Sequence, residues 1–131
     1  MPETDQSRPR ETILVVDDER PVRELVGDVL RLQGYEVLTA EDGLSALRAA
    51  DSHSGPIDLV VVDVVIPGMH VKDLVDRLTT ARPGIKALYI SGFTGDLVGL
   101  QGQVRLETNF LQKPFTVDGL ARKVRDVLGA A

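Results

Sequence analysis

The sequence predicts an α/β fold in which helices cover both faces of a parallel β-sheet. Short apolar runs rich in β-branched residues, such as residues 13–16, are typical of strands that are buried on both faces. Segments with apolar residues at helical spacing lie between these runs, and this alternation is typical of a doubly wound sheet with right-handed crossovers. Within the 131 residues, the polar segment 1–11 is expected to be a disordered leader and residues 12–129 one folded domain.

The first strand is followed by a strongly amphipathic helix. Asp18 or Glu19 lies near its expected cap, and Pro21 falls in its first turn, where a missing N–H is tolerated. Gly34 is expected to end the helix. The expected apolar face comprises Val22, Leu25, Val26, Val29 and Leu30.

A second strand–helix pair and a third strand come next. Residues 35–39 form the second, shorter strand, and Asp42 is expected to cap the helix after it. The apolar residues of that helix are Leu44, Ala46, Leu47 and Ala50. The third strand, residues 57–62, is a continuous apolar run interrupted by one aspartate, and it ends at Asp63.

The last part of the chain repeats the same alternation. The third helix carries an apolar stripe of Val71, Leu74, Val75 and Leu78. The fourth strand, residues 86–90, ends at Ser91, and the fifth strand, residues 109–112, ends at Lys113. Thr116 is expected to cap a final helix. Its apolar face comprises Leu120, Val124, Val127 and Leu128.

The segment between the fourth and fifth strands is unfavourable for a helix. Residues 92–109 contain four glycines, and each costs about 1 kcal/mol inside a helix. The fourth helix is therefore expected to be short, displaced or mobile. With this exception the elements fit a flavodoxin-like five-stranded parallel sheet in the order 2-1-3-4-5.

Polar residues stand at four of the predicted strand ends. They are Asp17 and Asp18 after the first strand, Asp63 after the third, Ser91 after the fourth and Lys113 after the fifth. In a sheet of this order these strands are neighbours, and ligands bind beyond their carboxyl ends. We therefore expect three carboxylates, one hydroxyl and one ammonium to converge on one site.

Such a site is suited to a metal ion and a phosphoryl group. Two carboxylates about 4 Å apart repel by about 4 kcal/mol at an effective dielectric constant of 20, so the cluster favours a proton or a cation. Because the donors are all oxygens, Mg²⁺ suits them best. Metal and lysine can neutralise phosphoryl oxygens, and Asp63, on the middle strand, is the expected nucleophile that forms an aspartyl phosphate.

Four motifs resemble the receiver domain of bacterial two-component signalling, and most closely the receivers attached to hybrid sensor histidine kinases. The resemblance covers about residues 12–128, and its motifs occur in the same order and at similar spacing. They are ILVVDDE at residues 13–19, DVVIPGM at 63–69, LYISG at 88–92 and FLQKPF at 110–115.

The resemblance implies a role for each metal-site residue. Asp63 would accept a phosphoryl group from the phosphohistidine of a sensor histidine kinase or a histidine phosphotransfer domain. Asp18 would bind Mg²⁺ directly and Asp17 would assist, often through water. The backbone carbonyl of Val65 would complete the protein ligands.

The resemblance also implies a conformational switch. Ser91 and Lys113 would contact the phosphoryl group, and Phe110 would be the aromatic residue that turns inward as the hydroxyl moves. The fourth and fifth strands would then present a changed face to a downstream protein. The bond between Lys113 and Pro114 is a candidate for the cis geometry.

Departures from the family pattern and alternative functions also have to be weighed. Ile66 stands where a methionine is usual, and Val71 where a glycine opens the third helix, but neither is a phosphoryl ligand. Phe110 can equally be a core residue of its strand. A nucleotide binder would have a glycine-rich loop in place of Asp17, and an aspartyl phosphatase would have a second aspartate at position 65. An interaction module that is never phosphorylated remains the main rival.

The composition excludes several kinds of binding partner and metal site. The net charge of −5 argues against direct nucleic acid binding, and the absence of cysteine excludes disulfides and thiolate metal sites. No apolar run is long enough for a membrane span, so a cytoplasmic location is expected. We expect the chain to be a signalling phosphoacceptor and not a turnover enzyme. Both a stand-alone regulator and a piece of a hybrid kinase fit this sequence.

Overall fold

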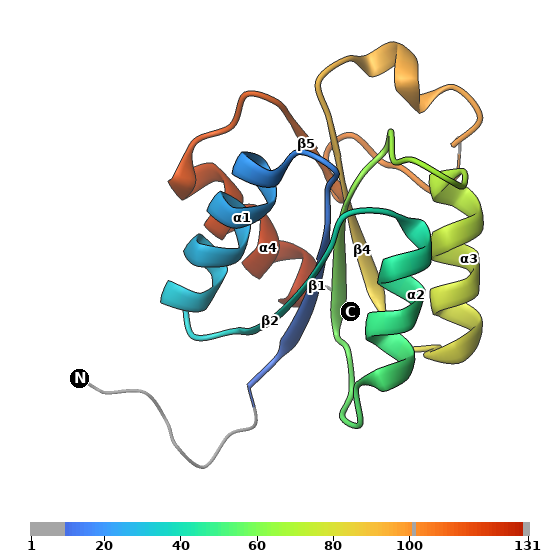
Figure 1. Ribbon diagram of the computed structural model, residues 1–131. Helices are drawn as coiled ribbons and strands as arrows, with labels where there is room; N and C mark the ends of the chain where they lie inside the picture. The colour runs from blue at the N-terminus through green and yellow to red at the C-terminus, as the bar shows by residue number, and fades with distance from the viewer. Residues whose placement is uncertain (1–9, 101, 130–131) are drawn as a thin grey trace.

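The computed structural model describes residues 10–100 and 102–129. Most of the expected leader, residues 1–9, lies outside this described part. The chain forms one five-stranded parallel sheet in the order β2-β1-β3-β4-β5, which confirms the predicted topology (Figure 1). Its strands are β1 (Thr12–Val16), β2 (Glu36–Ala40), β3 (Leu59–Asp63), β4 (Lys86–Ser91) and β5 (Phe110–Gln112).

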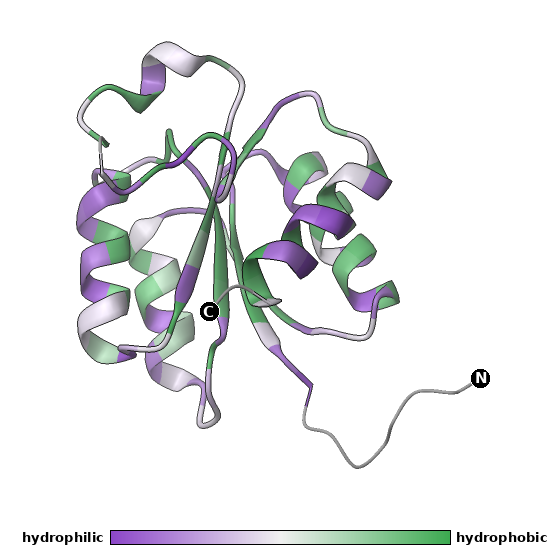
Figure 2. Cartoon of the chain, turned by 180° about the vertical axis from the view of Figure 1, so that it is seen from behind, coloured by the Kyte–Doolittle hydropathy of each residue, from purple (hydrophilic) through white to green (hydrophobic). Residues whose placement is uncertain are grey.

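Helices cover both faces of the sheet (Figure 1). Helices α1 (Arg20–Leu32) and α4 (Val117–Gly129) lie on one face, and α2 (Gly43–Ser52) and α3 (Val71–Ala81) on the other. The buried side chains form two clusters, one on each face, because successive strand residues point to opposite sides. Figure 2 shows the strands as the apolar interior and the polar residues on the outward helix surfaces. Among the described residues no helix is long and apolar enough to cross a membrane.

Two residues assigned to helix cores from the sequence are in fact exposed. Leu25 and Leu44 are 48% and 53% exposed, whereas Val26, Leu30 and Ala46 are buried. Helical spacing places all of these residues near one stripe, but only the part of the stripe that faces the sheet is covered. The predicted core faces of α1 and α2 were therefore too wide.

Local capping follows the sequence closely. The Asp42 side chain accepts a hydrogen bond from the Ser45 backbone N–H at 2.8 Å, and Thr116 caps α4 by accepting from Gly119 at 2.9 Å. Gly34 has a φ of 98°, the left-handed conformation that favours glycine at a helix end.

β3 begins at Leu59, two residues later than expected from the apolar run. The Lys113–Pro114 bond is cis, as the resemblance implies.

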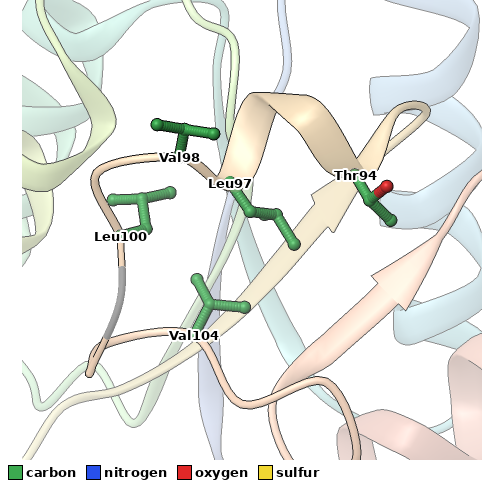
Figure 3. Close-up of a pocket in the computed structure, with 5 residues that line it drawn as sticks. All are labelled: Thr94, Leu97, Val98, Leu100 and Val104. Atoms are coloured by element: carbon green, nitrogen blue, oxygen red, sulfur yellow. The ribbon is translucent and has the colours of Figure 1, made fainter.

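No α-helix forms among the described residues between β4 and β5. This segment contains only η1 (Thr94–Leu97), one turn of 3₁₀-helix, so the expectation of a short fourth helix is confirmed. Gly99 and Gly102 have φ values of 93° and 89°, which are incompatible with a right-handed helix. A small pocket lies between η1 and the following loop (Figure 3). It is lined by Thr94, Leu97, Val98, Leu100 and Val104.

One arginine joins the two helices on the second face. Arg82, just after α3, donates hydrogen bonds to the carbonyl oxygens of Gly55, Ala50 and His53 at 2.7, 2.9 and 2.9 Å. These carbonyls lie in the last turn of α2 and the loop that follows it. The guanidinium therefore supplies donors to carbonyls at the end of α2, where, among the described residues, the Ala50 carbonyl otherwise accepts only a 3.4 Å hydrogen bond from the His53 N–H.

Candidate functional site

The carboxyl ends of the parallel strands meet at one edge of the sheet, as predicted. Asp17 follows β1, Asp63 is the last residue of β3, and Lys113 follows β5. Both aspartates are buried, with side chains only 4% and 11% exposed, and the Lys113 side chain is 20% exposed. Residues separated by up to 96 positions in the chain therefore form one charged cluster.

Lys113 occupies the centre of this cluster. Its Nζ atom lies 2.6 Å from Oδ2 of Asp63, 3.2 Å from Oε1 of Glu19 and 3.4 Å from Oδ2 of Asp17. One carboxylate oxygen from each acid lies within 4.8 Å of the other two. With three carboxylates and one ammonium, the formal charge of the cluster is −2 when all four groups are ionised. This charge and the oxygen-only donor set fit a divalent cation of the Mg²⁺ class.

The third carboxylate of the cluster comes from Glu19 and not from Asp18. The Asp17 carboxylate accepts a hydrogen bond from the Glu19 backbone N–H at 2.9 Å, so the chain turns directly after β1. In this turn Asp18 is exposed, and the longer Glu19 side chain reaches Lys113. The expected convergence of Asp17, Asp18 and Asp63 is corrected in this respect. The direct metal-binding role of Asp18 stays a prediction.

The sequence indicates Glu19 only as a residue near the cap of the first helix. It is the N-terminal flanking residue of α1, but its side chain makes no capping hydrogen bond. A run of three acidic residues at a strand end was the available signal for a larger acidic site. Which of the three side chains faces the cluster depends on the turn, and the sequence pattern does not specify that turn.

The phosphoacceptor candidate Asp63 is held by both of its oxygens. Oδ1 accepts a hydrogen bond from the Val65 backbone N–H at 2.8 Å, and Oδ2 accepts one from Lys113. Val65 itself is 57% exposed, in the loop that leads to α3. Ile66 and Val71, the two departures from the family pattern, are buried in the core on the α2–α3 face. Core packing behind the loop therefore accommodates both of these residues.

Ser91 ends β4, the strand next to the one that ends at Asp63, and its hydroxyl is bonded to the following loop. The side chain is fully buried, and its Oγ donates a hydrogen bond to the Phe93 carbonyl at 2.7 Å. The same oxygen accepts from the Phe93 backbone N–H at 3.1 Å. A contact between this hydroxyl and a phosphoryl group would require the Ser91 side chain to leave its present partners.

Phe110, on the edge strand β5, has a buried side chain. It is 7% exposed, faces Tyr89 in the register of β4 and β5, and belongs to the core cluster on the α2–α3 face. Burial raises the pKa of Tyr89 to about 12, as expected of a phenol in an apolar environment. This placement fits a core residue, and the role of Phe110 as a switch stays a prediction.

Burial and charge act in opposite directions in this cluster. The pKa of Asp17 is raised, chiefly because burial disfavours its charged form, although the Glu19 N–H and Lys113 oppose this shift. Burial acts to lower the pKa of Lys113, but the hydrogen bond and the attraction to Asp63, Asp17 and Glu19 outweigh it and raise the pKa. The ammonium is therefore stabilised, and the Asp17 carboxylate is not.

Replacing Asp17 with asparagine is expected to stabilise the metal-free protein at pH 7. A carboxyl group with a raised pKa in the folded state supports folding below its ordinary pKa of 3.8 and loses this contribution as the pH rises through the folded value. At pH 7 the charged form therefore opposes folding. Urea denaturation in EDTA should show a higher midpoint for Asp17→Asn, with a gain that shrinks toward pH 3.

The exposed neighbour provides the control for this experiment. Asp18→Asn removes the same charge from an exposed position, so the midpoint should change little. A lower midpoint for Asp17→Asn at pH 7 would show that its hydrogen bond from Glu19 and its attraction to Lys113 outweigh burial.

Comparison with known proteins places the whole folded part in one family. The profile of the response regulator receiver domain matches residues 13–125. The sensor kinase CckA of Brucella abortus (strain 2308) is 37% identical over 119 residues, which cover 89% of this chain and 12% of that protein. The response regulator receiver protein CpdR of the same strain is 28% identical, and the match covers 91% of this chain and 98% of CpdR.

Solved structures agree with this similarity. A crystal structure of the receiver domain from the hybrid histidine kinase CckA has a TM-score of 0.73 at 35% identity and covers 89% of this chain and 98% of its own. A receiver domain protein from Methanospirillum hungatei JF-1, at 24% identity, shares the fold with a TM-score of 0.78, over 92% of this chain and 94% of its own. Among the curated relatives the chain spans 12% of CckA, 49% of the regulator TcrX of Mycobacterium tuberculosis and 31% of a cyclic di-GMP phosphodiesterase of Thermotoga maritima.

Proposed function

Because this chain belongs to the response regulator receiver domain family, a family of two-component signalling domains, we propose that Asp63 is its phosphoacceptor. The phosphoryl donor is a phosphohistidine on a sensor histidine kinase or a histidine phosphotransfer domain. The product is an aspartyl phosphate that alters the surface formed by β4, β5 and the segment between them. A downstream protein reads that change.

The observation that carries this proposal is the setting of the Asp63 carboxylate. It is nearly buried, its Oδ1 is oriented by the Val65 N–H, and its Oδ2 is bound to the Lys113 ammonium. A carboxylate held in this way is a positioned nucleophile with a cation already beside it. The two backbone-anchored acids, Asp17 and Asp63, form the base of the site.

The reaction follows from this arrangement. A carboxylate oxygen of Asp63 attacks phosphorus, the P–O bond forms, and the P–N bond of the phosphohistidine breaks. The electron pair leaves on the imidazole nitrogen, which takes a proton from solvent. The Lys113 ammonium, beside Asp63, is close enough to meet the phosphoryl oxygens and neutralise part of their charge.

A divalent cation of the Mg²⁺ class fits the same residues. Asp17 and Asp63 would hold it, with the Val65 carbonyl and either Asp18 or Glu19 beside it, and it would neutralise charge on the phosphoryl oxygens. The chain's own contribution is to fix the two aspartates through backbone N–H groups before the donor arrives.

The switch begins at Ser91 and Lys113. A phosphoryl group on Asp63 attracts both the ammonium and the hydroxyl, so Ser91 is drawn away from its hydrogen bonds to Phe93. Since Phe93 is the second residue of the glycine-rich segment 92–109, its release changes the conformation of that segment. Hydrogen exchange at residues 92–100 and 102–109 is expected to slow on phosphorylation, and unchanged exchange there would argue against this switch.

The direct test is phosphorylation by a small donor. The protein is incubated with Mg²⁺ and acetyl phosphate and its intact mass is measured, beside Asp63→Asn and a sample with EDTA. A gain of one phosphoryl group in the wild type, absent from both controls, supports the proposal. Folded protein that binds Mg²⁺ but gains no mass would instead favour an interaction module that is not phosphorylated.

The phosphorylated state is expected to be long-lived. Val65 and Phe93, two residues after Asp63 and Ser91 respectively, are 57% and 65% exposed, and neither side chain can orient a water molecule for attack on the phosphoryl group. Val65→Asn or Phe93→Glu supplies a polar group and should raise the hydrolysis rate at least about threefold. Loss of the phosphoryl mass after donor removal measures this rate. Leu106→Asn, at another exposed apolar residue, is the control, and equal rates in all variants would contradict the expectation.

A further inference from the structure

The Lys113 ammonium lies among the three carboxylates that would hold a divalent cation. It contacts all three carboxylates, and one oxygen from each of them lies within 4.8 Å of the other two. A divalent cation bound to Asp17 and Asp63 would repel an ammonium at this position strongly. Lys113 must therefore move when the cation enters, yet it must stay close enough to meet the phosphoryl group.

The three carboxylates differ in their ability to follow a moving ammonium. Asp17 and Asp63 are short, nearly buried and held by backbone N–H groups at 2.9 and 2.8 Å. The Glu19 side chain is 62% exposed, and within the described part of the chain Lys113 is its one side-chain partner. Glu19 is therefore the mobile and outward member of the cluster.

We propose that Glu19 is a positioning residue that takes over the Lys113 ammonium when a divalent cation occupies Asp17 and Asp63. This inference rests on the proposed function. Glu19 holds the displaced ammonium at the rim of the site, within reach of an incoming phosphoryl group. The acid that the sequence indicated as a helix cap thus acts on the cation site through the lysine.

The proposal has a specific energetic consequence. Without the Glu19 charge, an incoming cation must displace an ammonium that has no second carboxylate to move toward. Glu19→Gln, which keeps the length and hydrogen-bonding capacity of the side chain, is therefore expected to weaken Mg²⁺ affinity about threefold to tenfold. Most of this effect should disappear when Lys113 is replaced, because there is then no ammonium to displace.

The test is a double-mutant cycle on Mg²⁺ affinity. Backbone amide chemical shifts follow Mg²⁺ titrations of the wild type, Glu19→Gln, Lys113→Met and the double variant, without any phosphoryl donor. Glu36→Gln is the matched control, since Glu36 begins β2 at the opposite end of the strands. Its replacement changes the net charge equally and should leave the affinity unchanged.

Each outcome has a distinct meaning. A large loss of affinity from Glu19→Gln in the wild type, with a clearly smaller loss in the Lys113→Met background, supports the proposal. Equal losses in both backgrounds overturn it and make Glu19 a direct contributor to the cation site. No loss in either background also overturns it. A wild type that binds no Mg²⁺ at all overturns the proposed function itself, and this inference with it.

Discussion

Replacing Lys113 with methionine is expected to lower the free energy of unfolding of the metal-free protein by about 2 kcal/mol at pH 7. Methionine keeps most of the side-chain volume but leaves the carboxylates of Asp17, Glu19 and Asp63 without their shared cation. Two of these acids are almost completely buried, so water cannot compensate fully for the lost ammonium.

The shift in the pKa of Lys113 supports the direction of this effect. The pKa of Lys113 is raised from its ordinary value of 10.5, so its charged form is favoured by the folded state. A base with a raised pKa contributes its full stabilisation below the unfolded value and loses it only as the pH rises through the folded value. At pH 7 the contribution is therefore complete, and Lys113→Met removes all of it.

Urea denaturation with EDTA and with Mg²⁺ measures this prediction. Mg²⁺ at tenfold its dissociation constant should restore about 1.4 kcal/mol, because the cation replaces the missing charge and binds only the folded state. Lys72→Met is the control, since Lys72 forms a solvent-exposed pair with Asp76 whose loss should change the midpoint little. A Lys113→Met protein as stable as the wild type in EDTA would mean that the cost of burying the ammonium cancels its attractions.

Replacing Arg82 with alanine is expected to lower the free energy of unfolding by about 3 kcal/mol. The guanidinium donates three hydrogen bonds to carbonyl oxygens near the end of α2, at 2.7–2.9 Å. These acceptors lose their guanidinium donors in the variant, and the helix dipole loses a cation at its negative end. The partners lie 27–32 positions before Arg82 in the chain, so the contact joins α2 to α3.

Two further variants separate geometry from charge at this position. Arg82→Lys keeps the charge but not the planar fork of donors, so it should lose about half as much stability as Arg82→Ala. Arg77→Ala removes an exposed arginine from α3 and should change the unfolding free energy by less than about 0.5 kcal/mol. Equal losses for the arginines at 77 and 82 would argue against a specific bridge, and the proposed phosphoacceptor site should show the same Mg²⁺ affinity as the wild type in all three variants.

The elements of the fold and the edge of the site were predictable from local chemistry. Runs of valine, isoleucine and leucine specify strands buried on both faces, and their alternation with amphipathic segments specifies the parallel sheet. Asp42 and Thr116 cap helices by bonds to backbone groups three residues away, so short-range sequence is sufficient. Glycines between β4 and β5 exclude a regular helix for an equally local reason.

Residue contacts within the site required the tertiary structure. The parallel order already brings Asp17, Asp63 and Lys113 to one edge, since functional residues follow strand ends in this class of fold. Whether Asp18 or Glu19 reaches Lys113 depends on the turn that the Asp17 side chain makes after β1. The binding of the Ser91 hydroxyl to Phe93 likewise depends on the path of the following loop.

The sequence by itself thus determined the fold class, the strand order and the charged edge, because these follow from hydrophobic periodicity and chain connectivity. The tertiary structure alone decided which side of α1 and α2 is covered, where Leu25 and Leu44 are exposed. It also decided that Arg82 bridges two helices and that Glu19 joins the cluster. Side-chain direction and long-range contacts depend on the packing of segments far apart in the chain, and no local pattern encodes them.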